Sequence, residues 1–178
     1  KVLSSKKVSF FQLRLKNLAD NEIIKIGNKI KPITKKHKVF FLINDSYKIA
    51  KKIKADGCHL GQKDGLTTNA FKCLGNKIIG ITCHNSKVFA DEAIKDKATY
   101  LAFGSFFKSK LKPNAIKANL KILSWVKKKT KKPIVAIGGI NEKNYKKLIN
   151  AGANYVAISS FIWNNPFLKP ELAIKKFN

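Results

Sequence analysis

The feature that most constrains the fold is a repeat of short apolar runs, rich in β-branched and aromatic residues, separated by amphipathic stretches. The seven runs are 8–15, 38–45, 57–62, 77–84, 100–107, 133–140 and 155–162. Near-continuous apolar runs of this kind are typical of strands that are covered on both faces, as in parallel sheets. Because strand and helix patterns alternate without a long linker, the sequence predicts βαβ units and a parallel sheet.

The stretches between these runs carry helix signals. In 20–36, isoleucines recur at spacings of three and four, and Asp20 is placed to cap the helix. A second helix is expected to begin with Asn141 as its cap and to end at Gly152, where a left-handed residue is needed.

Seven strands are one short of a (β/α)8 barrel, and we predict an α/β fold of the TIM type in a single domain, 1–178. The opening residues, "KVLSSKK", look like the end of a helix that precedes the strand near Phe10. We therefore expect the first strand and most of the first helix of the barrel to be absent from the chain as given. A doubly wound open sheet is the alternative, although no G-x-G-x-x-G turn supports a dinucleotide-binding version.

The composition favours a globular protein that does not cross a membrane. Of 178 residues, 44% are hydrophobic, and no apolar run approaches the ~20 residues of a membrane-spanning helix. The formal charge of +27 comes almost entirely from lysines scattered through every segment, without a stacking motif or recognition helix, so no specific nucleic-acid partner is expected. The three cysteines, Cys58, Cys73 and Cys83, lack metal-site spacing and are typical of a reducing compartment, which predicts a cytoplasmic protein.

In a barrel of this type the active site lies at the carboxyl ends of the strands. Asp45 and Asp64 follow two neighbouring strands, and two carboxylates can hold Mg²⁺ while leaving its other positions to water and phosphate oxygens. Arg14 and Lys16, two residues apart on a strand, would point to one face and grip a diphosphate. Glycines and serines after the last two strands, with a helix N-terminus, would form a phosphate cradle.

Each of these residues also has a purely structural interpretation. Asp45 could cap the helix that begins at Ser46, and Asp64 could serve the turn before Gly65. Gly138 and Gly139 could serve only the close packing of a strand on a helix. Arg14 and Lys16 could be solvated strand-end charges, and Lys112 is one lysine among many. Their shared location at one rim, rather than any single residue, favours a functional site.

Four segments of the chain, taken in order, resemble thiamin phosphate synthases. "QLRLK" is similar to the Q-L-R-E-K strand end of that family, and "LINDSYKIAKKIKADGCHLGQKD" to its I-N-D…A-D-G-V-H-L-G-Q-E-D segment. "IIGITCHN" resembles the G-x-S-x-H strand, and "VAIGGI…AGANYVAISSFI" resembles the last two units. The paired I-N-D and H-L-G-Q-x-D motifs are the most specific part of the resemblance.

The resemblance implies an enzyme of thiamin biosynthesis that joins hydroxymethylpyrimidine diphosphate to thiazole phosphate and releases diphosphate. It implies that Asp45 and Asp64 bind Mg²⁺, and that Arg14, Lys16 and Lys112 are catalytic. The pyrimidine diphosphate would be held by Gln12, Arg14, Lys16, Asn44, Thr82 and Lys112. The thiazole phosphate would be held by Ser109, Lys110, Leu111, Gly138, Gly139, Ser159 and Ser160.

The chain departs from the family pattern at several positions. Leu15 and Lys63 replace acidic residues, Thr82 replaces a serine, and Leu111 supplies no hydrogen bond where the family has a threonine. Three other functions therefore stay open: a thiazole tautomerase-like paralogue, a non-catalytic phosphate-binding barrel, and a basic nucleic-acid-binding protein. The expected partners are small-molecule substrates, and a homo-oligomer is left open.

Overall fold

The structure is a computed structural model that describes residues 1–108 and 117–177. The chain forms two compact units, Val2–Ile81 and Thr82–Asn178, with Lys1 joined to the second. We call them the amino-terminal and the carboxyl-terminal unit and describe each by itself. The expectation of a single domain over 1–178 stays a prediction.

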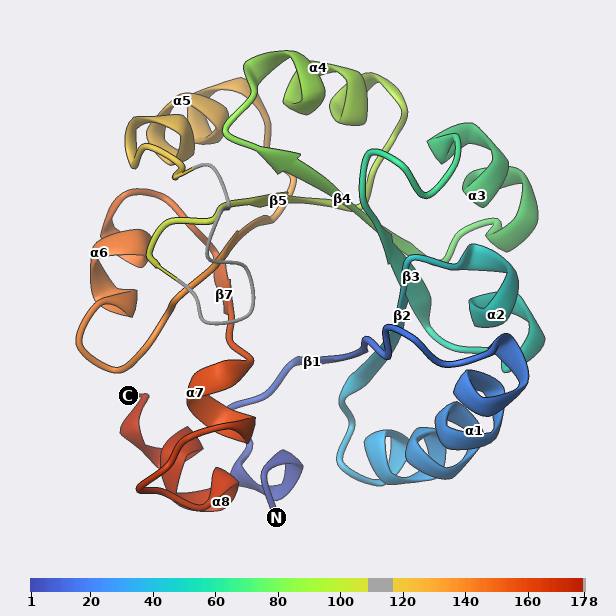
Figure 1. Cartoon of the computed structure of the whole chain (residues 1–178). Coiled ribbons are helices and arrows are strands. Elements are labelled where there is room, and N and C mark those ends of the chain that lie inside the picture. The colour runs from blue at the N-terminus through green and yellow to red at the C-terminus, as the bar shows by residue number, and fades with distance from the viewer. Residues whose placement is uncertain (109–116, 178) are drawn as a thin grey trace. The chain divides into compact units, whose positions relative to one another are not determined.

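The amino-terminal unit alternates parallel strands with helices (Figure 1). Its elements are η1 (Leu3–Ser5), β1 (Phe10–Leu13), α1 (Asp20–Lys36), β2 (Phe40–Asn44), α2 (Tyr47–Lys52), β3 (Gly57–Leu60), α3 (Thr67–Leu74) and the first part of β4 (Ile78–His84). Neighbouring strands pair in chain order, with Gln12 opposite Leu42 and Asn44 opposite His59. Since β1, β2 and β3 all run parallel, their carboxyl ends lie at one edge of the sheet.

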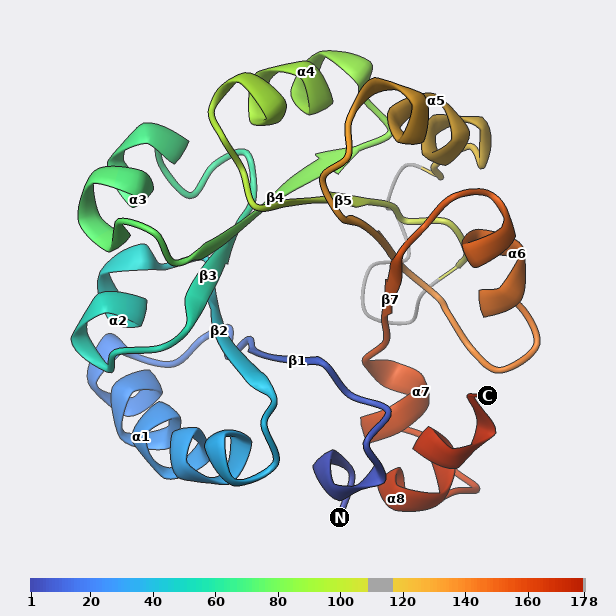
Figure 2. The same ribbon diagram turned by 180° about the vertical axis from the view of Figure 1, so that it is seen from behind.

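The carboxyl-terminal unit repeats this alternation, as the view from behind in Figure 2 also shows. After the last residues of β4 come α4 (Lys87–Lys95), β5 (Tyr100–Phe103), α5 (Lys121–Lys129), β6 (Ile134–Ile137), α6 (Tyr145–Asn150), β7 (Tyr155–Ala157), α7 (Ser160–Trp163), α8 (Pro170–Ala173) and η2 (Ile174–Lys176). Strands β5, β6 and β7 are parallel and pair in chain order. All seven predicted strands are therefore present in the described parts of the chain.

Strands of both units are buried on both faces. In β2, the consecutive residues Phe41, Leu42 and Ile43 have exposed fractions of 0%, 2% and 1%. Successive side chains of a strand point to opposite faces, so three buried neighbours require cover on each side. The consecutive residues Leu101, Ala102 and Phe103 in β5 are also buried. This pattern confirms the interpretation of the apolar runs as strands with two covered faces.

The predicted helix ends are correct in part. Helix α1 covers Asp20–Lys36 as expected, but its N-cap is Ala19, whose N–H donates to the Glu22 carboxylate at 3.1 Å, so the assignment of Asp20 as the cap was wrong. Helix α6 begins at Tyr145 with Asn144 as N-cap, not with Asn141. Gly152, with φ +120°, does follow the end of that helix. The opening residues form a 3₁₀ turn, η1.

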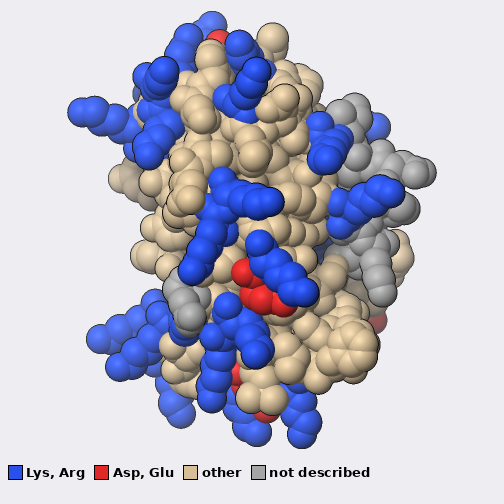
Figure 3. All heavy atoms as spheres, turned by 90° about the vertical axis from the view of Figure 1, so that its left-hand side faces the viewer, with Lys and Arg blue, Asp and Glu red and all other residues tan. Residues whose placement is uncertain are grey.

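Lysine and arginine side chains are spread over the face drawn in Figure 3 rather than gathered in one patch. The three cysteines are free thiols, and Cys58 and Cys83 are buried. Burial raises the pKa of each of these two thiols to about 12, so both stay protonated near neutral pH.

Over residues 1–108 and 117–177, none of the helices combines the length and the apolar character that crossing a membrane requires.

The close pairing of β3 and β4 gives a test of the fold. A Cβ at Gly57 would overlap the backbone carbonyl of Ile78, so we expect Gly57→Ala to lower the free energy of unfolding by about 1–3 kcal/mol. Gly27→Ala is the matched control, because the only close contact of its Cβ would be the end of the flexible Ile53 side chain, at 2.8 Å, and its other contacts are ordinary. Gly27 lies inside α1, where alanine is favoured by up to about 1 kcal/mol. Urea unfolding of both variants is the measurement, and equal tolerance of the two substitutions would contradict the β3–β4 pairing.

Candidate active site

Asp45 is the first residue after β2, and its backbone conformation turns the chain sharply there. Its φ is +65°, in the left-handed region, and its N–H donates to the carbonyl of His59 at 2.8 Å. The cap of the following helix is Ser46, whose hydroxyl accepts from the Ile49 N–H at 3.2 Å. The capping interpretation of Asp45 is therefore wrong, and its carboxylate is left for another role.

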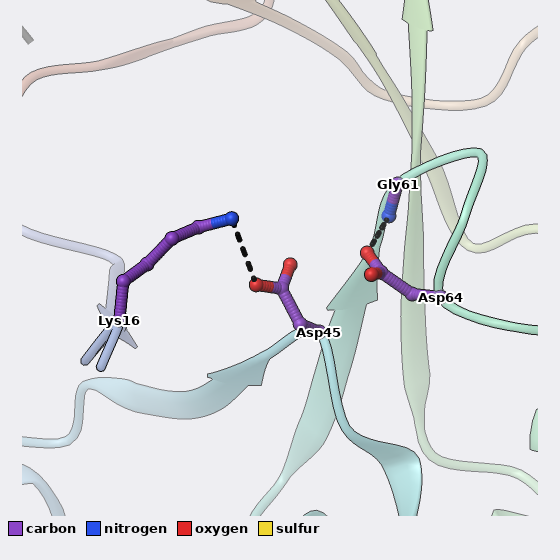
Figure 4. Close-up of polar contacts among 4 residues, drawn as sticks. All are labelled: Lys16, Asp45, Gly61 and Asp64. Carbon is purple, nitrogen blue, oxygen red and sulfur yellow. Dashed lines mark hydrogen bonds and ion pairs between the residues drawn. The ribbon is translucent and has the colours of Figure 1, made fainter. Parts of the chain in front are cut away.

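Asp64 lies after β3 and does serve the turn, as its structural interpretation predicted. The Gly61 N–H donates to Asp64 Oδ2 at 2.6 Å, and the Asp64 N–H donates back to the Gly61 carbonyl at 3.3 Å. This hydrogen-bonded loop fixes the carboxylate beside the end of β3 (Figure 4). The turn uses Oδ2 as its acceptor, so the turn role does not exclude a ligand at the other oxygen.

The two carboxylates act on one another. The pKa of Asp45 is raised above its ordinary value, first by burial and then by a hydrogen bond to and repulsion from Asp64. Lys16 and Arg14 work in the opposite direction, since their positive charges lower that pKa. Because the Asp64 carboxylate makes ionisation of Asp45 less favourable, a bound cation would stabilise the pair.

Arg14 and Lys16 lie beyond the end of β1 at Leu13, so the expectation that strand geometry places them on one face was wrong. They nevertheless gather at Asp45. Lys16 Nζ is 3.7 Å from Asp45 Oδ2, and Figure 4 shows this side chain reaching toward the carboxylate. The side chains of this pair are 57% and 39% exposed, and such a surface ion pair contributes little stability. Lys16 can therefore exchange its partner for a phosphate at small cost.

Gln12 and Asn44 complete the predicted set in this unit. Gln12 lies in β1, Asn44 is the last residue of β2, and both are half-buried. The amino-terminal unit thus brings all six of its predicted site residues to the carboxyl ends of β1, β2 and β3: Gln12, Arg14, Lys16, Asn44, Asp45 and Asp64.

The donor set of this unit fits Mg²⁺ better than a softer metal. Within the described ranges, no group of three or more His, Cys, Asp or Glu side chains could hold a metal ion. Two carboxylates and no thiolate or imidazole cluster match an ion that takes one or two protein carboxylates and keeps its other positions for water and phosphate.

The described predicted residues of the carboxyl-terminal unit lie in β4, after β6 and at the start of α7. Thr82 is half-buried in β4, and Gly138 and Gly139 follow β6 with φ values of +104° and +64°. Ser159 precedes α7 and Ser160 is its first residue; since α7 has only four residues, the expected helix N-terminus there is short. Residues Ser109, Lys110, Leu111 and Lys112 lie outside the described residues.

The two glycines pack against the chain that follows β5, not against a helix as their structural interpretation supposed. The N–H groups of Phe106 and Phe107 donate to the carbonyls of Ile137 and Gly138 at 3.2 and 3.1 Å. A Cβ at Gly138 would overlap Ser105, and a Cβ at Gly139 would overlap the backbone of Phe107 and Lys108. Both positions therefore require glycine for close approach as well as for positive φ.

Comparison with known proteins agrees with this arrangement. A family model described as thiamine monophosphate synthase matches residues 1–162. Thiamine-phosphate synthase from Pelagibacter ubique (strain HTCC1062) is 58% identical over 175 residues, which cover 98% of this chain and 84% of that protein. The chain belongs to the thiamine monophosphate synthase family. It is accordingly an enzyme of thiamin biosynthesis, a transferase.

Solved structures of this family and of others support the same fold class. Thiamine phosphate pyrophosphorylase from Pyrococcus furiosus matches with a TM-score of 0.88 at 29% identity, covering 98% of this chain and 84% of that one. A 3-hexulose-6-phosphate synthase matches with a TM-score of 0.70 at 18% identity, covering 98% and 87%, and this likeness concerns the fold alone. The predicted α/β class of the TIM type is confirmed.

Sequence reasoning missed the asparagines that tie the loops of this thiamine monophosphate synthase family member together. The Asn85 side chain accepts from the Asn119 N–H at 3.0 Å, joining the chain after β4 to the chain before α5. The Asn144 side chain contacts the glycine turn after β6. The sequence did offer a sign of the role of Asn144, because this residue lies just before a helical pattern. We assigned the cap of that helix to Asn141 and gave Asn144 no role.

The raised pKa of Asp45 predicts how this residue affects the stability of the enzyme. Between the ordinary and the raised pKa, the native state binds more protons than the unfolded chain, so the free energy of unfolding falls as pH rises through that range. We therefore expect Asp45→Asn, without added metal, to leave the thermal midpoint at neutral pH unchanged or slightly higher. Its stability should also vary less with acidic pH than that of the wild type.

Thermal unfolding followed by circular dichroism over a pH series is the measurement. Asp91→Asn is the control, because the Asp91 carboxylate forms a surface ion pair with Lys129 at 3.4 Å. A loss of several degrees at neutral pH in Asp45→Asn would show that the ionised carboxylate stabilises the fold, contrary to this prediction.

Proposed function

We propose that the enzyme joins hydroxymethylpyrimidine diphosphate to thiazole phosphate in a Mg²⁺-dependent reaction, giving thiamin phosphate and diphosphate. The observation that carries the proposal is the carboxylate pair Asp45 and Asp64, which lies with Arg14 and Lys16 at the ends of three adjacent strands. Opposite charges side by side are suited to a metal–diphosphate group, which needs acidic groups for the metal and basic groups for the phosphates.

Asp45 and Asp64 would hold the metal. When bound, Mg²⁺ would neutralise charge on the diphosphate leaving group. Asp45 suits this role because its carboxylate does not cap a helix and because Asp64 lies beside it, so that burial and Asp64 together raise its pKa. The Lys16 ammonium lies near the Asp45 carboxylate. When the metal binds Asp45, this ammonium would contact the diphosphate instead.

The basic residues would stabilise the leaving group. In the proposed step the bond between the pyrimidine methylene carbon and the diphosphate oxygen breaks, and its electron pair goes to the oxygen. The lone pair of the thiazole nitrogen then forms the new carbon–nitrogen bond. Arg14, Lys16 and Lys112 would stabilise the developing negative charge, and positioning plus electrostatics replace a covalent nucleophile. Gln12, Asn44 and Thr82 would orient the pyrimidine diphosphate.

The thiazole phosphate would be held in the carboxyl-terminal unit. Gly138, Gly139, Ser159 and Ser160 are the described residues proposed for this role, and Ser109, Lys110 and Leu111 complete the proposed set. The glycines support it through backbone geometry, because close approach and positive φ make their N–H groups available to an anion.

The other functions have less support. A tautomerase-like paralogue of the kind considered above would typically lack the aspartate pair, which this chain keeps. A non-catalytic phosphate-binding barrel would have no use for a metal-binding carboxylate pair. A nucleic-acid-binding role has no basic patch behind it on the face drawn in Figure 3. We further propose that the enzyme acts in the cytoplasm, supported by its free cysteines, and that its oligomeric state is open to measurement.

Removing either aspartate should abolish most of the activity. Asp45→Ala or Asp64→Ala removes a metal ligand and with it charge stabilisation of the leaving diphosphate, so we expect kcat to fall at least about a hundredfold. Asp91→Asn is the control, with activity near that of the wild type, because this surface residue lies on α4. Steady-state formation of thiamin phosphate, with thermal unfolding to verify folding, is the measurement.

Chelation tests the metal separately. Wild-type turnover should stop in excess EDTA and return when Mg²⁺ is restored. Turnover that persists without any divalent cation would refute the proposed role of the carboxylate pair. The absence of thiamin phosphate under all conditions would refute the proposed reaction.

A further inference from the structure

We propose that Asn144 is a positioning residue that sets the peptide orientation of the glycine turn after β6 for binding of the thiazole phosphate. The proposal rests on the proposed function above and assigns a role to a residue outside the predicted site. Its basis is the hydrogen bonding of the turn Gly138–Asn141, all of which lies within the carboxyl-terminal unit.

The Asn144 side chain does not do what its position predicts. Asn144 is the N-cap of α6, where an asparagine side chain ordinarily accepts a hydrogen bond from the first turn of the helix. No such side-chain cap bond is present at this described residue. Instead its Nδ2 donates to the Gly139 carbonyl at 3.0 Å, and its Oδ1 accepts from the Asn141 N–H at 2.9 Å. The side chain thus bridges two backbone groups of the turn, the Gly139 carbonyl and the Asn141 N–H.

The chain after β5 makes a second hydrogen bond to the same turn. The Phe107 N–H donates to the Gly138 carbonyl at 3.1 Å, so the carbonyls of both glycines are engaged. A peptide group is planar, and its N–H points opposite to its C=O. Fixing the Gly138 carbonyl therefore fixes the Gly139 N–H, and fixing the Gly139 carbonyl fixes the Ile140 N–H.

These two N–H groups are suited to an anion. Among the described residues, neither the Gly139 N–H nor the Ile140 N–H donates a hydrogen bond. Phosphate oxygens are strong acceptors for backbone N–H groups of this kind. The bond from Asn144 to the Gly139 carbonyl also polarises that peptide, which makes the Ile140 N–H a better donor. Asn144 therefore acts on the phosphate through the backbone rather than by contact.

Two substitutions at Asn144 test this role. Asn144→Ala removes the donor without adding charge, and Asn144→Asp keeps an acceptor for Asn141 but faces the Gly139 carbonyl with an oxygen. We expect both to raise KM for the thiazole phosphate about tenfold or more, the size expected for a hydrogen bond to a charged group. KM for the pyrimidine diphosphate and kcat at saturation should stay within about twofold, as for a group that binds ground state and transition state alike.

Asn154 supplies the matched control at the opposite end of the same strand. Its Oδ1 accepts from the Ile134 N–H at 2.9 Å, so it also holds β6 by one side-chain bond, but away from the glycine turn. Asn154→Ala and Asn154→Asp should leave both KM values near those of the wild type. Thermal midpoints of all four variants identify any effect that comes from the fold.

The outcomes separate this proposal from the proposed function. If the wild type makes thiamin phosphate and Asn144→Ala leaves KM for thiazole phosphate unchanged, the positioning role is wrong and the proposed function stands. An effect in Asn144→Asp alone would come from charge, and equal effects on both substrates would come from the fold; either result overturns the proposal. If the wild type makes no product, calorimetric titration with thiazole phosphate decides. Binding by the wild type that weakens in Asn144→Ala supports the role, and no binding by the wild type overturns it.

Discussion

The proposed chemistry depends on two carboxylates held against their mutual repulsion. Asp45 and Asp64 are brought together by hydrogen bonds to neighbouring backbone groups. The Asp45 N–H is tied to the His59 carbonyl of the neighbouring strand, and the Asp64 side chain is tied to the Gly61 N–H. The parallel pairing of β2 with β3 places these two turns at the same edge of the sheet. Burial raises the pKa of Asp45 most, the hydrogen bond to and repulsion from Asp64 raise it further, and the charges of Lys16 and Arg14 lower it.

The phosphate site proposed in the carboxyl-terminal unit relies on backbone rather than on charge. Gly138 and Gly139 follow β6 with positive φ and lie against the backbone of 105–108, where any side chain would clash. Their carbonyls are engaged by Phe107 and Asn144, so the direction of the next N–H groups is set. The two proposed sites are preorganised in different ways. The metal and the diphosphate would meet fixed side-chain charges, whereas the thiazole phosphate would meet fixed backbone dipoles.

The sequence predicted the large elements well because their signals are long. Apolar runs identified all seven strands, and the isoleucine spacing identified α1. The errors lie at helix caps, because several neighbouring polar residues are equally suited to the N-cap position. Ser46 rather than Asp45 is the N-cap of α2, and Asn144 rather than Asn141 is the N-cap of α6. The sequence also could not show that Arg14 and Lys16 lie past the end of β1, since strand ends depend on where pairing stops. The predicted site residues after β1, β2 and β3 still came together, because parallel pairing brings the carboxyl ends of neighbouring strands to one edge.

Because acidic residues are few in this chain, two aspartates side by side require an explanation. The chain has 10 Asp and Glu against 37 Lys and Arg, and most described turns that need a side-chain acceptor use Asn or Ser. An amide oxygen would accept from the Gly61 N–H as well as Asp64 does, without repelling Asp45. The Asp45 charge is not needed for capping, since Ser46 is the cap, and its exposed ion pair with Lys16 contributes little stability. Turn geometry alone therefore explains an oxygen atom at each position but not two negative charges, and this excess of charge supports the cation site that we propose for the pair.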